Sequence, residues 1–282
     1  MQKNVHLRCP VCEGSGSINI SEDVKSTTKR GILTVNVVEG AVCGHSFVVY
    51  LDMNFDIRDY FLADFTVELP KMEALQETRI EQNKDILDMY LIRMNLLPLT
   101  LTFIIKACFS KSKLLIIQKD EFIRRHILTF LEYVLKDSFD AEISIDSKKN
   151  YIKNKKGYKN YIVIEEKEIL KDKKKIVDVK NKKLKIERKI VQLFFSEQED
   201  DLCMFFLKNE IKKAYILSNS IVKYISSAKK EEKLSKVLLI INLEKEYNIK
   251  ISDFYFDFLM NIVIVYFKVK PPQIYKSLLS FL

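Results

Sequence analysis

Glycine is distributed unevenly along this chain. Five of the six glycines lie within the first 44 residues: Gly14, Gly16, Gly31, Gly40 and Gly44. Tight turns and bulges favour glycine, because it adopts backbone conformations that other residues avoid. We therefore expect turns and strands in the N-terminal quarter and longer elements in the rest. Pro70 marks the boundary, with a β-rich module over 1–69 and a second domain over 70–282.

Alternating apolar and polar residues predict strands in the N-terminal module. Residues 32–38 and 41–51 read as a hairpin around the turn dipeptide Glu39-Gly40, with Cys43 and His45 at the start of its second strand. Residues 55–69 predict one or two further strands. The candidates for their buried face are Phe55, Ile57 and Phe61.

After residue 70 the apolar spacing becomes mainly helical. A helix is predicted from residue 71 to Pro98, and an amphipathic helix over 120–137 with Phe122, Ile127, Phe130 and Val134 facing inward. Three short strands are predicted at 112–118, 141–146 and 161–166. About four helical segments follow over 200–282. The expected fold class is α+β, in which a small β-rich module precedes a mixed α+β domain that ends in a helical bundle.

Cysteine and histidine residues of the N-terminal module have metal-ligand spacing. Cys9 and Cys12 form a C-P-x-C pattern, and Cys43 and His45 complete a C-x2-C-x30-C-x-H set. Thiolate and imidazole groups are the ligands that zinc prefers, and four protein ligands are typical of a structural site. The sequence therefore predicts structural Zn2+. His6 stays open as an alternative to His45 for the fourth ligand.

The residues around this set also carry a resemblance. They are Cys9, Cys12, Cys43, His45, Phe47, Asp52, Asn54, Phe55, Arg58 and Tyr60. This array resembles a zinc ribbon, and more closely the N-terminal modules of uncharacterised proteins from Asgard archaea. Those modules share C-x-x-C, a short helix, a hairpin with C-x-H-x-F, and D-x-N-F-x-[IV]-R-x-Y. The resemblance covers about residues 6–66. It implies a zinc-binding module and says nothing of an activity.

The positive charge of the chain is concentrated in one segment. The whole chain has a net charge of +9, whereas residues 145–189 contain 16 Lys and one Arg against seven acidic residues. Lysines near phosphates release counterions and bind polyanions. The candidate contact residues are Lys153, Lys155, Lys156, Lys159 and Tyr158, and Tyr151 and Tyr161 could stack on bases with Tyr158. The alternatives are a solvated surface, an anionic membrane and an acidic protein.

Several other classes of protein are disfavoured. The glycine-rich phosphate-binding motifs are absent, and past residue 44 too little glycine remains to build them. The apolar stretch 254–267 is interrupted by Asp257 and Asn261, which predicts a buried core helix and not a transmembrane helix. The N-terminus has no signal-peptide pattern, and five cysteines do not form an even disulfide framework, so we expect a cytoplasmic protein.

The leading functional hypothesis is a non-catalytic adaptor that binds another macromolecule, with a protein partner first. The second is a nucleic-acid-binding protein that uses the lysine-rich segment, and a peripheral contact with an anionic membrane would suit the same charge. An enzyme remains a third hypothesis, because carboxylate constellations assembled by the fold cannot be recognised from one sequence.

Overall fold

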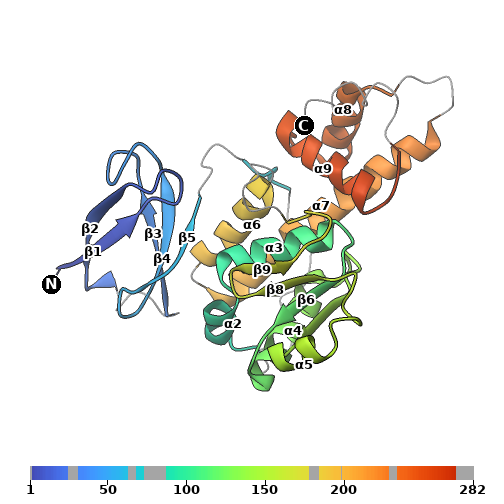
Figure 1. Ribbon diagram of the computed structural model, residues 1–282. Helices are drawn as coiled ribbons and strands as arrows, with labels where there is room; N and C mark the ends of the chain where they lie inside the picture. Colours follow the sequence, from blue (N-terminus) through green and yellow to red (C-terminus); the bar gives the residue numbers. More distant parts are fainter. Residues whose placement is uncertain are drawn as a thin grey trace.

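The computed structural model describes residues 2–24, 31–62, 68–72, 87–177, 184–197, 199–228 and 234–270. Their fold is α+β, as the sequence predicts. Two small antiparallel sheets come first, a mixed four-stranded sheet follows, and helices complete the chain (Figure 1).

The N-terminal region contains two antiparallel sheets. Strands β1 (Gln2–Arg8) and β2 (Ser15–Ser21) form the first sheet, and β3 (Ile32–Val37), β4 (Phe47–Asp52) and β5 (Ile57–Phe61) form the second. The predicted hairpin is β3–β4, but residues 38–46 connect its strands. Cys43 and His45 therefore lie in a loop before β4, not at the start of the strand.

The sheet β3-β4-β5 is buried on both faces, because alternate residues of β4 point in opposite directions. Phe47, Val49 and Leu51 pack against the β1–β2 sheet. Val48 and Tyr50 belong to the large core of the second domain, where the Tyr50 ring lies 5.4 Å from that of Phe195. The expected β-rich module is thus in contact with the remainder of the protein.

The prediction for the buried face of β5 was partly wrong. Phe55 and Phe61 are buried, but Ile57 is 37% exposed. Ile57 is the first residue of β5, an edge strand that pairs only with β4, so its side chain lies at the margin of the sheet. Residues 63–67, at the end of the predicted strand region, lie outside the described residues.

The second domain is built on the sheet β7-β6-β8-β9. Its strands are β6 (Leu114–Ile117), β7 (Ile143–Asp146), β8 (Ile162–Glu165) and β9 (Glu168–Lys171). Strand β6 pairs in parallel with β7 and β8, and all four of its residues are buried, as expected of a central parallel strand. Strand β9 is antiparallel to β8.

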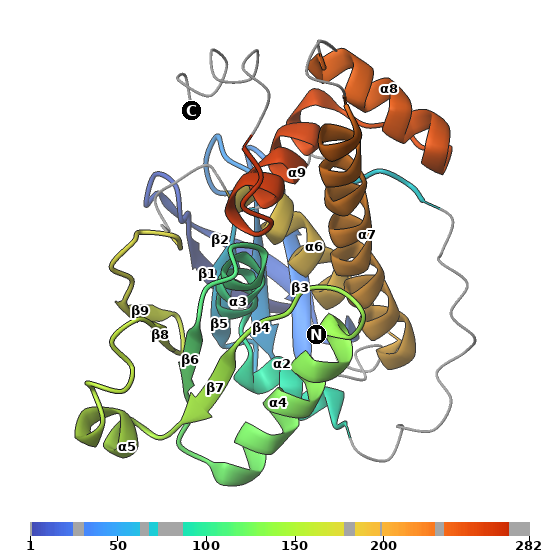
Figure 2. The same cartoon turned by 90° about the vertical axis from the view of Figure 1, so that its right-hand side faces the viewer.

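Helices lie on both sides of this sheet. Helix α4 (Glu121–Leu135) connects β6 to β7, and the short α5 (Lys148–Lys153) lies between β7 and β8. Figure 2 shows α5 on the opposite side of the sheet from α4 and α7. The side with α5 is covered by a smaller cluster, which consists of Leu115, Ile117 and Val163 with Tyr151, Tyr158 and Tyr161.

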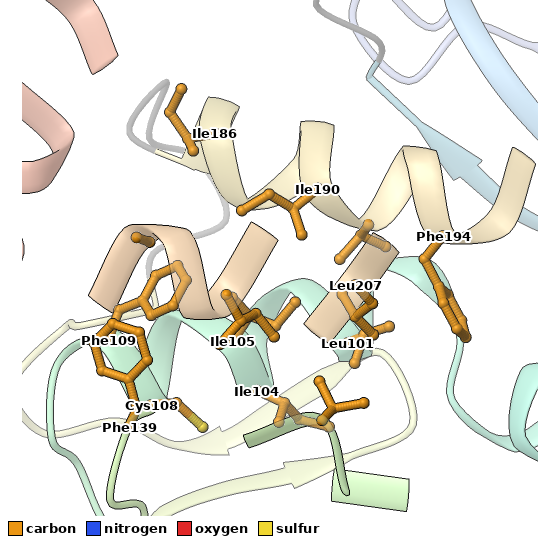
Figure 3. Close-up of a cluster of buried hydrophobic side chains, with 14 of the residues drawn as sticks. Leu101, Ile104, Ile105, Cys108, Phe109, Phe139, Ile186, Ile190, Phe194 and Leu207 are labelled. Carbon is orange, nitrogen blue, oxygen red and sulfur yellow. The ribbon is translucent and has the colours of Figure 1, made fainter. Parts of the chain in front are cut away.

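The large core is formed mainly by helices. Besides α4, they are α2 (Met89–Asn95), α3 (Pro98–Phe109), α6 (Lys185–Ser196), α7 (Asp200–Ser227), α8 (Lys236–Tyr247) and α9 (Asp253–Val265). Side chains of α3, α6 and α7 interdigitate at its centre, with Ile105, Ile190 and Leu207 among them (Figure 3). Helix α9 is the buried core helix that the apolar stretch predicts.

Two helix predictions needed correction. Pro98 does not end one long helix; it begins α3, because the first turn of a helix does not need the N–H that proline lacks. Residues 73–86 of the predicted helix lie outside the described residues. Phe122 is 57% exposed, since it lies in the first turn of α4, beyond the core that buries Ile127.

The last predicted helical segment, 271–282, also lies outside the described residues. Within the described part of the chain, no single helix is long and apolar enough to cross a membrane. Helices α2 and α3 meet that criterion only when they are taken together, and they are bent by 89°.

The Tyr50 hydroxyl is buried and has no hydrogen-bond partner among the described residues. Burial and the nearby Asp59 raise the pKa of this phenol, so it stays neutral. We expect Tyr50→Phe to stabilise the protein by about 1 kcal/mol in urea unfolding, because an unsatisfied polar group leaves the core.

The matched control is Tyr60→Phe. Its hydroxyl accepts from the Arg8 N–H at 3.1 Å, so a loss of stability is expected, and equal effects would contradict this account.

Candidate metal centre

The first two cysteines lie on a tight turn that follows β1. The Cys9 N–H donates to the Gly14 carbonyl at 2.8 Å, and the Glu13 N–H donates to the Cys9 carbonyl at 2.9 Å. Glu13 has a φ of 62°, in the left-handed region that such a turn requires. The Val11 N–H points at Cys9 Sγ, 3.4 Å away. The turn thus presents both thiols on one side.

The other two candidates lie on the loop between β3 and β4. The Gly40 N–H donates to the Cys43 carbonyl at 2.8 Å, and Gly40 has a φ of 89°. Cys43 Sγ lies 3.6 Å from His45 Nδ1. Gly16 in β2 lets this loop approach the β1–β2 hairpin closely, since a Cβ on Gly16 would lie only 3.2 Å from the Val42 backbone. The small size of Gly16 therefore serves the approach of this loop to the hairpin.

Together the two loops bring four potential metal ligands to one place. The ligand atoms of Cys9, Cys12, Cys43 and His45 all lie within 4.8 Å of one another. Cys9 is buried, Cys12 is exposed, and the other two are half-buried. This is a cluster of three thiols and one imidazole that is consistent with a bound metal ion. No other group of three or more such residues occurs within the described ranges.

The fold also distinguishes between the two candidate histidines. His6 is exposed on β1, between the buried residues Val5 and Leu7, and therefore points away from the core. Its Nδ1 atom lies 3.3 Å from Ser17 Oγ. His45 belongs to the cluster with the three cysteines, and His6 does not.

The electrostatics of the thiols suit a cation. Burial raises the pKa of Cys9, but the backbone N–H groups of Cys12 and Val11, together with the neighbouring thiols of Cys43 and Cys12, outweigh it, and the pKa is lowered overall. Burial and the neighbouring Cys9 thiol raise the pKa of Cys43 to about 11. The thiolate form of Cys9 is thus favoured, whereas that of Cys43 is opposed by burial and by the neighbouring Cys9 thiol. A divalent cation would offset the repulsion between neighbouring thiolates, because cysteine binds a metal in its thiolate form.

Comparisons of the chain with protein-family models, with curated proteins and with solved structures find no match. The structural finding is therefore the Cys3His cluster in an N-terminal β region. The resemblance to zinc ribbons remains an expectation from the sequence.

The structure places the predicted polyanion-contact residues in two kinds of environment. Lys153, Lys155, Lys156 and Lys159 are exposed on α5 and the turns after it. Tyr158 is half-buried, and its hydroxyl donates to Asp146 Oδ2 at 3.2 Å. Asp146 and burial both raise the pKa of Tyr158, with burial the larger cause. Its ring packs on the sheet and is not free to stack on a base.

A buried carboxylate links the two parts of the protein, and sequence reasoning missed it. Asp59 on β5 is buried and lies 2.9 Å from Nζ of Lys167, next to β8 and β9. Burial raises the pKa of Asp59, although Lys167 and the N–H of Leu99 in α3 favour its charged form. The spacing of residues in the sequence does not predict this contact, because Asp59 and Lys167 lie far apart along the chain.

Proposed function

We propose that Cys9, Cys12, Cys43 and His45 bind one zinc ion with a structural role, in a non-catalytic protein that binds another macromolecule. The observation that carries the metal assignment is the 4.8 Å limit on all ligand-atom separations. Tetrahedral zinc with usual bond lengths places a sulfur and a nitrogen ligand about 3.6 Å apart. The separation of Cys43 Sγ from His45 Nδ1 is 3.6 Å.

A structural role follows from the number of ligands. A catalytic zinc keeps one coordination position open for water or substrate, whereas four protein ligands fill a tetrahedral site. The four residues come from two loops, one after β1 and one before β4. An ion bound there ties the β1–β2 hairpin to the β3–β4 hairpin, so its binding energy contributes to folding.

The binding role is supported by the surface of the second domain. Five lysines between residues 149 and 159 are exposed, and they form no ion pair with any described carboxylate. Such a concentration of unpaired charge favours a polyanionic partner over the solvated surface that composition alone would suggest. This observation is independent of the metal site.

Metal analysis of the full-length protein tests the zinc assignment. We expect about one zinc per chain after purification without chelators, and a large loss in Cys43→Ser, because a three-ligand site binds far more weakly. His6→Ala is the matched control and should retain the metal, since His6 points away from the cluster. The assignment fails if Cys43→Ser and the original protein carry the same metal content, or if both carry none.

A further inference from the structure

The segment between β7 and β8 is strongly basic. Residues 147–161 include six lysines and no acidic residue. Lys148 is neutralised by Glu165, with its Nζ 2.6 Å from the carboxylate. The other five lysines are exposed and have no carboxylate partner: Lys149, Lys153, Lys155, Lys156 and Lys159. We call these five residues the lysine face.

Two other lysines of the basic region have structural partners, whereas Lys173, Lys174 and Lys175 are exposed. Lys167 pairs with Asp59, and Lys171 donates to the carbonyl of Tyr158. Just outside this region, Lys113 pairs with Glu142 at 2.8 Å. Lys167 and Lys171 thus hold the structure together, whereas the lysine face forms no ion pair with any described carboxylate; Lys155 lies over the Tyr151 ring, with its Nζ 5.9 Å from the ring centroid.

The lysine face is carried on an ordered base. Tyr151, Tyr158 and Tyr161 pack over the sheet, with ring centroids 6.2 Å apart for the first pair and 5.2 Å for the second. The Ser147 hydroxyl accepts from the Asn150 N–H and caps α5. Because the backbone that carries the lysines is held in this way, the segment does not need to fold at the moment of binding, which lowers the entropic cost.

We propose that the lysine face binds the phosphate backbone of double-stranded nucleic acid without preference for sequence. This names the partner of the proposed binding role and rests on that role, but not on the metal. Lysine binds phosphate as a point charge, whereas the reading of base edges favours arginine, which residues 147–161 lack.

Two other anionic partners fit less well. Single strands are bound by exposed aromatic rings that stack on bases, but here the three tyrosines pack on the sheet. A membrane contact would use exposed aromatic or apolar side chains between the lysines. In residues 147–161 the one large apolar side chain that is highly exposed is Ile152, at 57%.

Fluorescence anisotropy with the full-length protein tests the proposal. The probes are a labelled DNA duplex, an RNA duplex and a single strand of the same sequence, together with vesicles that contain phosphatidylserine. Five phosphate contacts predict a loss of duplex affinity on the order of several hundredfold between about 50 and 200 mM salt. Binding of either duplex supports the proposal, and the duplex that binds more tightly shows whether DNA or RNA is preferred.

Two triple variants with the same change of charge provide the comparison. Replacement of Lys153, Lys155 and Lys156 by Gln should weaken duplex binding about tenfold to hundredfold at low salt and reduce the salt slope by about 3. The control replaces Lys136, Lys223 and Lys245, which are exposed outside the lysine face. Thermal unfolding checks that both variants are folded, as expected for exposed positions.

Four results would overturn the proposal. They are equal losses in the two triple variants, absence of duplex binding at low salt, tighter binding to the vesicles than to either duplex, and tighter binding to the single strand. None of these depends on metal content, so failure here leaves the zinc assignment to its own test.

Discussion

Under the proposed zinc assignment, chelation is expected to unfold the β1–β2 hairpin and to leave β3–β5 and the second domain folded. An isolated two-stranded hairpin is marginal in water. In this protein the hairpin packs on one face of the β3-β4-β5 sheet, and Cys9 and Cys12 follow β1 directly. Structural zinc in small domains contributes an apparent binding energy of about 10–16 kcal/mol. We expect the packing of the hairpin on the sheet to contribute less free energy than this, so the hairpin should unfold when the metal is lost.

The sheet β3-β4-β5 should survive, because its other face is held by the second domain. Val48, Tyr50 and Phe61 belong to the large core, and Asp59 pairs with Lys167. These contacts do not involve the metal ligands. We therefore expect partial unfolding and not loss of the whole fold.

Hydrogen exchange with and without a strong chelator measures this outcome. Amides of Gln2–Arg8 and Ser15–Ser21 should exchange about 100-fold faster or more once the metal is removed, which corresponds to a loss of about 2.7 kcal/mol of local stability. Amides of Phe47–Asp52 should keep most of their protection. Cys43→Ser should give the same pattern without chelator. Uniform loss of protection, or no change in the hairpin, would show that the metal does not act in this way.

Arg93→Met is expected to destabilise the protein by about 3 kcal/mol or more. Arg93 is 2% exposed and donates to the carbonyls of Phe194 at 2.9 Å and Glu197 at 3.1 Å. These carbonyls belong to the C-terminal end of α6, where a helix has no partners of its own for its last C=O groups. Methionine would leave them buried and unpaired, which costs about 1–3 kcal/mol for each group.

The effect should reach the N-terminal sheets as well. The guanidinium of Arg93 lies 5.0 Å from the ring centroid of Phe194, and the neighbouring Phe195 packs on Tyr50 of β4. Thr34 of β3 also donates to the Phe195 carbonyl at 3.4 Å. Arg93 thus holds the end of α6 on which the β3-β4-β5 sheet lies.

Urea unfolding measures the change, and two further variants interpret it. Arg93→Lys keeps the charge but loses the planar fork of donors, so an intermediate loss is expected. Arg125→Met is the control, because Arg125 is exposed and forms a surface ion pair with Glu121 at 3.0 Å. Surface ion pairs of this kind contribute little. If Arg93→Met and Arg125→Met changed the stability equally, the buried contacts of Arg93 would not have the role described.

The ligand set and most of the described strands and helices could be predicted from local pattern. The C-x2-C and C-x-H spacings identify the four clustered residues, since short spacings place two ligands on one loop. A short apolar run located β6, periodicity located α4, and the longer apolar stretch at 254–267 located α9. Helix α3 was missed, because its apolar residues surround the helix and therefore lack a one-sided period.

The α+β fold class and the chemistry of the candidate metal centre could be predicted from residue type and short-range spacing, because these are local properties. The choice of His45 over His6 came from the three-dimensional arrangement, in which His45 joins the cysteines while His6 faces away. It also decided that the tyrosines of the basic segment pack on the sheet while the lysine face stays exposed. These outcomes depend on contacts between residues that are distant in sequence, such as Tyr50 with Phe195, and the spacing of residues along a chain does not predict such contacts.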